Sequence, residues 1–76
     1  MDFEVIIVSP KGKWQGKVSS LTLPAQDGEL TIRGGHASIF GRLKQGKILA
    51  GSHVQDIGGG FFEFTDDQAR ISLDEE

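Results

Sequence analysis

Apolar and polar residues alternate at a period of two along most of this chain. In the segment 69–73, Ala69, Ile71 and Leu73 share one face and polar residues occupy the other. The same spacing recurs in three further pairs, which are Leu21 with Leu23, Leu30 with Ile32, and Phe62 with Phe64. No stretch sustains apolar residues at the helical period of 3.6 for three turns. The pattern therefore predicts a series of short strands.

Turn residues separate these strand-like runs. Glycine and aspartate tolerate the positive φ angles of tight turns, and the chain contains eleven glycines in 76 residues. The candidate turns are Lys11-Gly12, Asp27-Gly28, Gln45-Gly46 and Asp66-Asp67. Short strands between turns are typical of an all-β sandwich or barrel. We expect a two-layer β-sandwich of short, mostly antiparallel strands, with residues 1–76 forming a single domain because the chain is too short for two cores.

Two of the runs are apolar on both faces. One covers residues 5–8, and the other begins with Phe61-Phe62 and continues to Phe64. One face of each run can fill the core, and the other face needs a cover, either a wrapping loop or another protein. A chain of this length has few loops long enough to wrap a strand. The pattern therefore leaves a wrapping loop and a partner surface as the two alternatives, and in a partner surface we expect Ile7 and Phe61 as contact residues.

Composition and charge narrow the functional classes. The absence of cysteine excludes disulfides, thiolate metal sites and thiol nucleophiles. The formal net charge of −3, from 8 basic and 11 acidic residues, argues against a protein specialised for phosphate backbones. No apolar run approaches the roughly 20 residues that a membrane helix needs, and no signal-peptide core follows Met1. We expect a soluble, intracellular chain.

Catalytic and metal-binding patterns are weak. No serine lies in a G-x-S-x-G motif, and a core this small builds no water-excluding pocket. His36 and His53 are the only imidazoles, with Asp27, Glu29 and Asp56 nearby in sequence. Their spacing does not force them to converge, since it matches no H-x-x-x-H or paired-carboxylate motif. The sequence therefore predicts neither an enzyme nor a metal or cofactor site.

Binding of single-stranded nucleic acid is the alternative function that the residues themselves allow. The segment 11–17 mixes lysines with Trp14, and the segment 60–64 is aromatic, as in strands that stack bases. Glu63 interrupts that aromatic strand, however, and the chain as a whole is acidic. The glycines at 58–60 lack the Lys-Ser/Thr of a phosphate-binding loop, so we interpret them as a tight turn or bulge beside Phe61.

A series of short motifs runs through the whole chain in a fixed order. Asp27-Gly28-Glu29-Leu30 is followed by Gly35-His36-Ala37, then by Leu43, Lys44 and Gly46, and later by Gly59-Gly60-Phe61-Phe62-Glu63. Val8-Ser9-Pro10, Gly16, Leu23-Pro24 and Ile71-Ser72-Leu73 complete the series. In order and spacing it resembles the N-terminal β-sandwich domain of the epsilon subunit of F-type ATP synthases. The stretch from Asp27 to Gly46 is the most specific part of the resemblance, and the Gly-Gly-Phe strand is an independent match.

The resemblance implies a function without bond chemistry. Members of this family form the foot of the rotor's central stalk, bind the gamma subunit on one flank and the ring of c subunits at the base, and transmit torque. It implies a non-catalytic subunit without cofactor or metal. It also implies a peripheral location on the cytoplasmic side of a bacterial inner membrane, or the equivalent organellar face, with membrane contact only through the c ring.

Three polar residues match positions with roles in the family. Glu29 matches a carboxylate near the polar loop of the c ring, His36 a loop histidine at the junction of ring and stalk, and Ser9 a stalk-facing position. We expect one glycine-rich loop to carry Glu29 and His36 to the ring, with Arg33 as a charge-assisted donor. Local interpretations stay open for the three matched residues: Glu29 as a solvated turn residue, His36 as a cap of its own loop, and Ser9 as the start of a turn before Pro10.

The sequence departs from the family pattern at three points. Thr31 and Gly34 stand where the family usually has glycine and proline, which changes the conformational freedom of the loop before His36. The C-terminal helical hairpin of the family is absent, because the sequence stops at Asp74-Glu75-Glu76. The inhibitory and nucleotide-binding roles of that hairpin are therefore not carried over. A start at Met1 favours a naturally short subunit over a truncated one.

Overall fold

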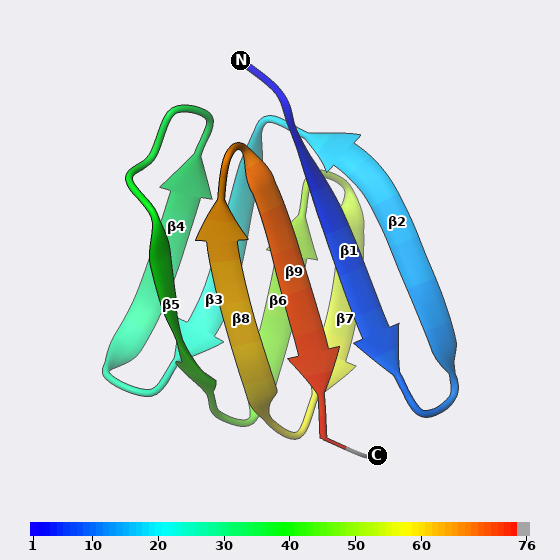
Figure 1. Cartoon of the computed structure of the whole chain (residues 1–76). Coiled ribbons are helices and arrows are strands. Elements are labelled where there is room, and N and C mark those ends of the chain that lie inside the picture. The colour runs from blue at the N-terminus through cyan, green and yellow to red at the C-terminus, as the bar shows by residue number, and fades with distance from the viewer. Residues whose placement is uncertain (75–76) are drawn as a thin grey trace.

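The computed structural model describes residues 1–74, and in that range the chain forms nine strands and no helix (Figure 1). Most strands are joined by tight turns, and the longest connection consists of residues 34–38. In chain order the strands are β1 (Phe3–Ser9), β2 (Gly12–Val18), β3 (Ser20–Ala25), β4 (Gly28–Arg33), β5 (Ile39–Leu43), β6 (Gly46–Ala50), β7 (His53–Ile57), β8 (Gly60–Thr65) and β9 (Gln68–Leu73).

The strands form two layers that face each other across the core. The first sheet has the order β2-β1-β9-β8-β5, and the second has the order β4-β3-β6-β7. The two layers join at one end of β3, where Ala25 pairs with Leu43 of β5. Between the strands of residues 1–74, β1 with β9 is the one parallel pair, and the other pairs are antiparallel. The predicted two-layer sandwich of mostly antiparallel strands is confirmed.

The predicted turns are present, with a small shift. Asp66 and Asp67 have φ angles of 52° and 55° and connect β8 to β9, as in a type I′ hairpin turn. At all three X-Gly turns, the glycine opens the following strand. Gly12 and Gly28 pair with the residue before the turn, whereas Gly46 pairs with Ile57 of β7. Gly12, for example, pairs with Ser9, so the turn itself consists of Pro10 and Lys11.

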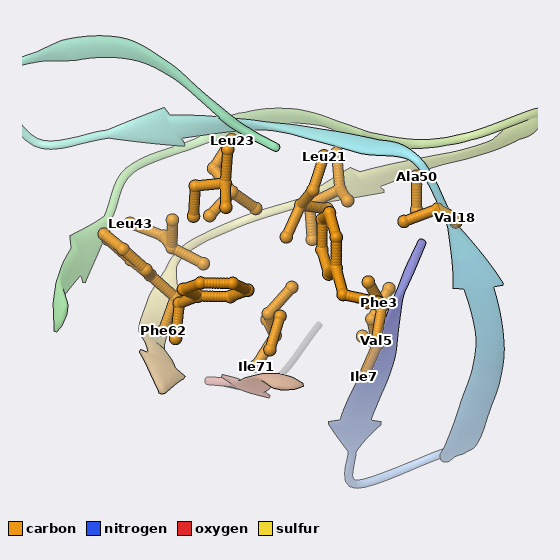
Figure 2. Close-up of a cluster of buried hydrophobic side chains, with 14 of the residues drawn as sticks. Phe3, Val5, Ile7, Val18, Leu21, Leu23, Leu43, Ala50, Phe62 and Ile71 are labelled. Carbon is orange, nitrogen blue, oxygen red and sulfur yellow. The ribbon is translucent and has the colours of Figure 1, made fainter. Parts of the chain in front are cut away.

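The core consists entirely of apolar side chains contributed by the inward faces of both sheets (Figure 2). Phe3 of β1 and Phe64 of β8 meet edge to face, with ring centroids 5.2 Å apart and planes at 82°. The predicted pairs lie on the inward faces, since Leu21, Leu23, Ile32, Phe62, Phe64, Ala69 and Ile71 are buried and Leu30 and Leu73 pack against them. Among residues 1–74, no polar or charged residue is buried.

One prediction about β1, the strand with apolar residues on both faces, is wrong. Ile7 was expected on a partner surface, but its side chain is only 1% exposed and lies in the core. Successive side chains of a strand point to opposite faces, so the burial of Phe3 and Val5 places Ile7 inside as well. The outward positions are Ile6 and Val8, and Val8 is 45% exposed. The cover that the sequence predicts must therefore contact these two residues.

Gly60 begins β8 at a place where no side chain fits. Its φ is +155°, and a Cβ built on it would collide with the backbone carbonyl of Ser72 on β9 and lie 3.0 Å from the Cα of Leu73. The preceding Gly59 also has a positive φ, of +143°. The interpretation of residues 58–60 as conformational glycines beside Phe61 agrees with this geometry.

We predict that Gly60→Ala lowers the free energy of unfolding by about 3 kcal/mol, because the neighbouring backbone cannot move away without breaking the β8–β9 pairing. Gly12→Ala is the matched control. Gly12 has nearly the same φ, +157°, but nothing lies within 4 Å of the position that its Cβ would take, so the substitution should cost only about 1 kcal/mol of backbone strain. Urea denaturation of both variants measures the difference. Equal losses would show that strain in φ, and not the collision with Ser72, dominates at Gly60.

Candidate functional site

Exposed apolar side chains lie among polar ones on the outer face of the first sheet, where Arg70 and Glu63 separate Ile6 from Phe40. Val8 of β1 and Phe61 of β8 lie in the same cross-strand row, because both pair with Ser72 of β9. Phe40 of β5 is 82% exposed and Phe61 is 49% exposed. With Ile6, these residues form what we call the apolar patch: Ile6, Val8, Phe40 and Phe61. A surface of this kind, with aromatic residues among polar neighbours, is typical of a protein–protein contact.

Phe61 is the best-placed anchor in the apolar patch. Arg42 pairs with it across β5 and β8, and the guanidinium carbon of Arg42 lies 4.5 Å from the centre of the Phe61 ring. A cation over an aromatic face is attracted by the ring quadrupole, so Arg42 holds the ring in place. Aromatic and arginine side chains also dominate binding energy at interfaces. Among the sequence-predicted residues, Phe61 therefore lies where a partner could reach it.

Ser9 ends β1 on the side-chain face that Val5 and Ile7 share, opposite the apolar patch, and its hydroxyl takes part in the local turn. The amide of Lys11 donates a hydrogen bond to Ser9 Oγ at 3.3 Å, and Ser9 Oγ lies 3.3 Å from the carbonyl oxygen of Gly12, to which it donates. The local interpretation of Ser9 as the start of a turn is therefore confirmed. A partner that contacts Ser9 would meet a hydroxyl that already has hydrogen-bond partners.

Glu29 and Arg33 lie on the outer face of β4, and both are exposed. Their side chains share a face because they are four residues apart, which places their Cα atoms roughly 13 Å from each other along the strand. Glu29 lies within the strand next to the β3–β4 turn, while His36 belongs to the connection that follows the strand's other end (Figure 1). The prediction of one loop that carries both residues is wrong, because the whole of β4 separates them.

The connection that carries His36 is fixed by several hydrogen bonds. The amide of His36 donates to the carbonyl oxygen of Arg33 at 3.1 Å, and His36 Nδ1 lies 2.7 Å from the carbonyl oxygen of Ala37. The amide of Gly35 donates to a carboxylate oxygen of Asp67 at 3.0 Å, which ties the connection to the β8–β9 turn. His36 therefore caps its own loop, as the local interpretation holds, while its ring stays exposed.

A groove beside β4 was not predicted from the sequence. It has a volume of about 290 Å³ and lies between the β3–β4 turn and β5, with Glu29, Leu30 and Phe40 among its lining residues. Side chains of successive residues in Ile39–Leu43 point to opposite faces, and this alternation could have placed Phe40 on the outer face, since Leu43 is on the inner one. The groove's presence, however, follows from the divergence of β4 and β5, which no local pattern encodes.

Trp14 and His53 close the opposite side of the sandwich. Trp14 comes from β2 and His53 from β7, which are the outermost strands of the two sheets. Their rings are stacked, with centroids 4.2 Å apart and planes at 9°, and His53 Nε2 lies 3.0 Å from Oε1 of Gln55. The stacked face of Trp14 is therefore occupied and does not serve as a platform for a base. His53 and His36 lie on different elements and make separate contacts.

The described residues contain no group of three or more His, Cys, Asp or Glu side chains arranged to hold a metal ion. They also contain no helix that could cross a membrane.

Comparison with known proteins identifies what the chain resembles. A family model described as "ATP synthase, Delta/Epsilon chain, beta-sandwich domain" matches residues 2–75. The ATP synthase epsilon chain of Chlorobium limicola is 38% identical over 73 residues, which cover 88% of this chain and 83% of that protein. The epsilon chain of Dichelobacter nodosus is 35% identical over 79 aligned positions, covering 96% of this chain and 55% of that protein.

Other matches are partial in length or remote in sequence. The epsilon chain of Campylobacter jejuni subsp. doylei is 49% identical over 43 residues, covering 55% of this chain and 33% of that protein. The chain thus spans about half or less of the length of several relatives. A chain in the central stalk/c-ring structure of the Tetrahymena thermophila mitochondrial ATP synthase superposes with a TM-score of 0.73 over 92% of this chain and 61% of that one, at 20% identity.

We predict a large loss of stability for one of the two apolar candidates and a small loss for the other. Ile7→Ala should lower the free energy of unfolding by about 3 kcal/mol, because it leaves a cavity in the core. Phe61→Ala should cost only about 1 kcal/mol, because half of its ring is already in solvent. Chemical denaturation followed by Trp14 fluorescence measures both. A loss at Phe61 as large as that at Ile7 would assign Phe61 to the fold and remove it from the surface.

Proposed function

Because the chain belongs to the family of ATP synthase delta/epsilon β-sandwich domains, we propose that it is a central-stalk subunit that links gamma to the c ring and transmits torque for ATP synthesis. In this role it performs no bond chemistry and needs no cofactor. It meets the membrane only indirectly, through the c ring, on the cytoplasmic side of a bacterial inner membrane or the equivalent organellar face. The observation that supports this role best is the exposed apolar patch on a sandwich of this family.

The apolar patch is the proposed gamma-facing surface. Val8, Phe40 and Phe61 are exposed in the isolated chain, and burial against a permanent partner subunit would remove this apolar area from water. Arg42 over the Phe61 ring adds a charged group that can reach a carboxylate of the partner while it stays stacked. The opposite outer face, on the second sheet, exposes Leu49 and Val54 but no aromatic side chain among its described residues, and therefore serves the gamma contact less well.

The outer face of β4 is the proposed ring-facing surface. Glu29 and Arg33 are exposed there, and charged side chains of both signs suit hydrogen bonds to a polar loop. Since His36 lies beyond the far end of β4, a partner that touches both Glu29 and His36 must extend along the whole strand. Ser9 lies at the end of β1 with its side chain on the face opposite the apolar patch, so in this arrangement a gamma contact would reach it only at the rim of the surface.

Torque transmission requires that the two surfaces keep a fixed relation to each other. The apolar patch lies on the first sheet and β4 belongs to the second, and the sheets share one closely packed core. Packed protein interiors have low compressibility and transmit strain. The pairing of Ala25 with Leu43 also joins the sheets through backbone, on the side where β4 lies. A load applied to one surface is therefore carried to the other.

We predict that Phe61→Asp weakens association with gamma at least about tenfold, because it places a charge in the proposed apolar contact. Val54→Asp is the matched control, since Val54 is 57% exposed on the other sheet. Co-purification with a gamma subunit, followed by titration of the complex, compares the two variants. Wild-type association of Phe61→Asp, or an equal loss in Val54→Asp, would exclude the apolar patch as the gamma contact.

For the ring contact, Glu29→Lys should weaken docking of the gamma complex to c rings by about three- to tenfold and change the melting temperature of the isolated chain little. Asp56→Lys serves as control, because Asp56 is an exposed carboxylate on β7 whose ion pair with Lys47 is solvent-accessible. Ring binding and thermal denaturation are measured on the same preparations. A large drop in melting temperature with unchanged docking would give Glu29 a structural role instead.

A further inference from the structure

The outer edge of β4 has unused backbone hydrogen-bonding groups. β4 pairs with β3 on one side, and within residues 1–74 no strand pairs with it on the other. The hydrogen bonds of β3 show which groups are free. The amide of Lys44 donates to the carbonyl of Pro24 at 2.9 Å, and the amide of Gln26 donates to the carbonyl of Arg42 at 3.0 Å. Even-numbered residues of β3 thus direct their backbone groups away from β4.

The alternate residues of β4 must then face the open edge. The odd-numbered residues of β3 bond to β4 and pair with its even-numbered residues 28, 30 and 32. Glu29, Thr31 and Arg33 consequently direct their N–H and C=O groups outward from the sheet. The carbonyl of Arg33 agrees with this, because it accepts from the amide of His36 outside the β3–β4 ladder.

The side chains at this edge are self-complementary. Glu29 and Arg33 lie two residues before and two residues after Thr31, on the same outer face and with opposite charges. If a second β4 strand lies antiparallel to the first and Thr31 faces its own copy, each Glu29 faces Arg33 of the second copy. Opposite charges directly across an antiparallel pair are stabilising. The twofold axis creates two such pairs.

We propose that two copies of this chain associate through their β4 edges, antiparallel about a twofold axis at Thr31. In this dimer the amides of Thr31 and Arg33 donate to the carbonyl oxygens of Thr31 and Glu29 of the second copy and continue the second sheet across the interface; the carbonyl oxygen of Arg33 already accepts from the amide of His36. Because the twofold axis uses the β4 edge of each copy once, association stops at a dimer and does not continue into a longer assembly.

Comparison with β2, another edge strand, shows why we place the dimer contact at β4. β2 is the outermost strand of the first sheet and exposes Lys13, Gln15 and Lys17. A twofold axis at Gln15 would place Lys13 opposite Lys17 of the second copy, which is a like-charge contact. Lysines on an edge are a common protection against edge pairing. β4 contains neither lysine nor proline, so it lacks this protection.

The dimer and the proposed ring contact exclude each other. Both use the β4 surface that carries Glu29 and Arg33, so a subunit engaged with its copy cannot dock there. One strand pair is a small interface, and we expect a dissociation constant on the order of 10 μM. The dimer would therefore form where free subunit accumulates and dissociate when a stronger partner takes up the β4 surface.

Sedimentation equilibrium of the chain alone, from about 1 μM to about 1 mM, tests the proposal. The wild type should change from monomer to dimer across this range. Glu29→Arg and Arg33→Glu should each raise the dissociation constant about tenfold or more, because each places like charges opposite each other. The double variant Glu29→Arg/Arg33→Glu restores opposite charges and should return the constant to within about threefold of wild type. Asp56→Arg, with the same charge change as Glu29→Arg, should leave it unchanged.

A second variant addresses the backbone directly. Thr31→Pro removes an amide that faces the open edge and is not used by β3, so the fold should persist while the dimer is lost. Trp14 fluorescence and circular dichroism report the fold. A monomeric wild type at every concentration would overturn the proposal, as would a double charge variant no more dimeric than the single ones, or a folded Thr31→Pro variant that dimerises like wild type. Because only this chain is present, the result is independent of the gamma and ring assignments.

Discussion

The structure depends on one constraint, which is that each sheet must bury a single apolar face against the other. Because residues 1–74 bury no polar or charged residue, the core gains its stability from apolar burial and close packing alone. The strand alternation then decides what the surface carries. On β1, burial of Ile7 requires that Ile6 and Val8 point outward, although all three are equally apolar. The apolar patch is thus a consequence of how the core is filled.

The middle of β1 does not select a buried face by itself, because residues 5–8 are all apolar. The start of the strand does, since a slip of one residue would bury Glu4 in place of Phe3, which is 2% exposed and packs edge to face against Phe64. The neighbouring strands add to this preference. On the outer face, Ile6 pairs with Gln15 of β2 and with Arg70 of β9, two polar side chains that cannot enter the core without a large desolvation cost. β1 therefore takes its register from Phe3 and Glu4 at its start, together with the polar positions of the strands on either side.

The two sheets are connected in different ways on the two sides of the sandwich, and this difference leaves β4 with an open edge. On one side Ala25 and Leu43 continue the hydrogen-bonded sheet from one layer to the other. On the other side, the contact between the sheets is the stack of the Trp14 and His53 rings, which involves side chains and no backbone pairing. β4 lies beyond the backbone junction, where it has one neighbour and an open edge. That edge is available for binding and exposed to unwanted pairing, and the proposed pair of copies would cover it, together with Glu29 and Arg33, until the dimer dissociates.

The amino-acid sequence by itself determined the strands, the turns and the inward faces of most strands, because period-two alternation and turn residues are local properties. It also carried the family resemblance through the motifs around Glu29 and His36. The apolar residues 5–8 left the buried face of β1 undecided in the sequence prediction, although Phe3 and Glu4 at the start of the strand distinguish the two faces; the tertiary structure buries Phe3, Val5 and Ile7. It also decided that β4 separates Glu29 from His36 and that Phe40 lies beside an open groove. Those relations depend on how strands distant in sequence pair, and pairing is settled by the fit of the whole core.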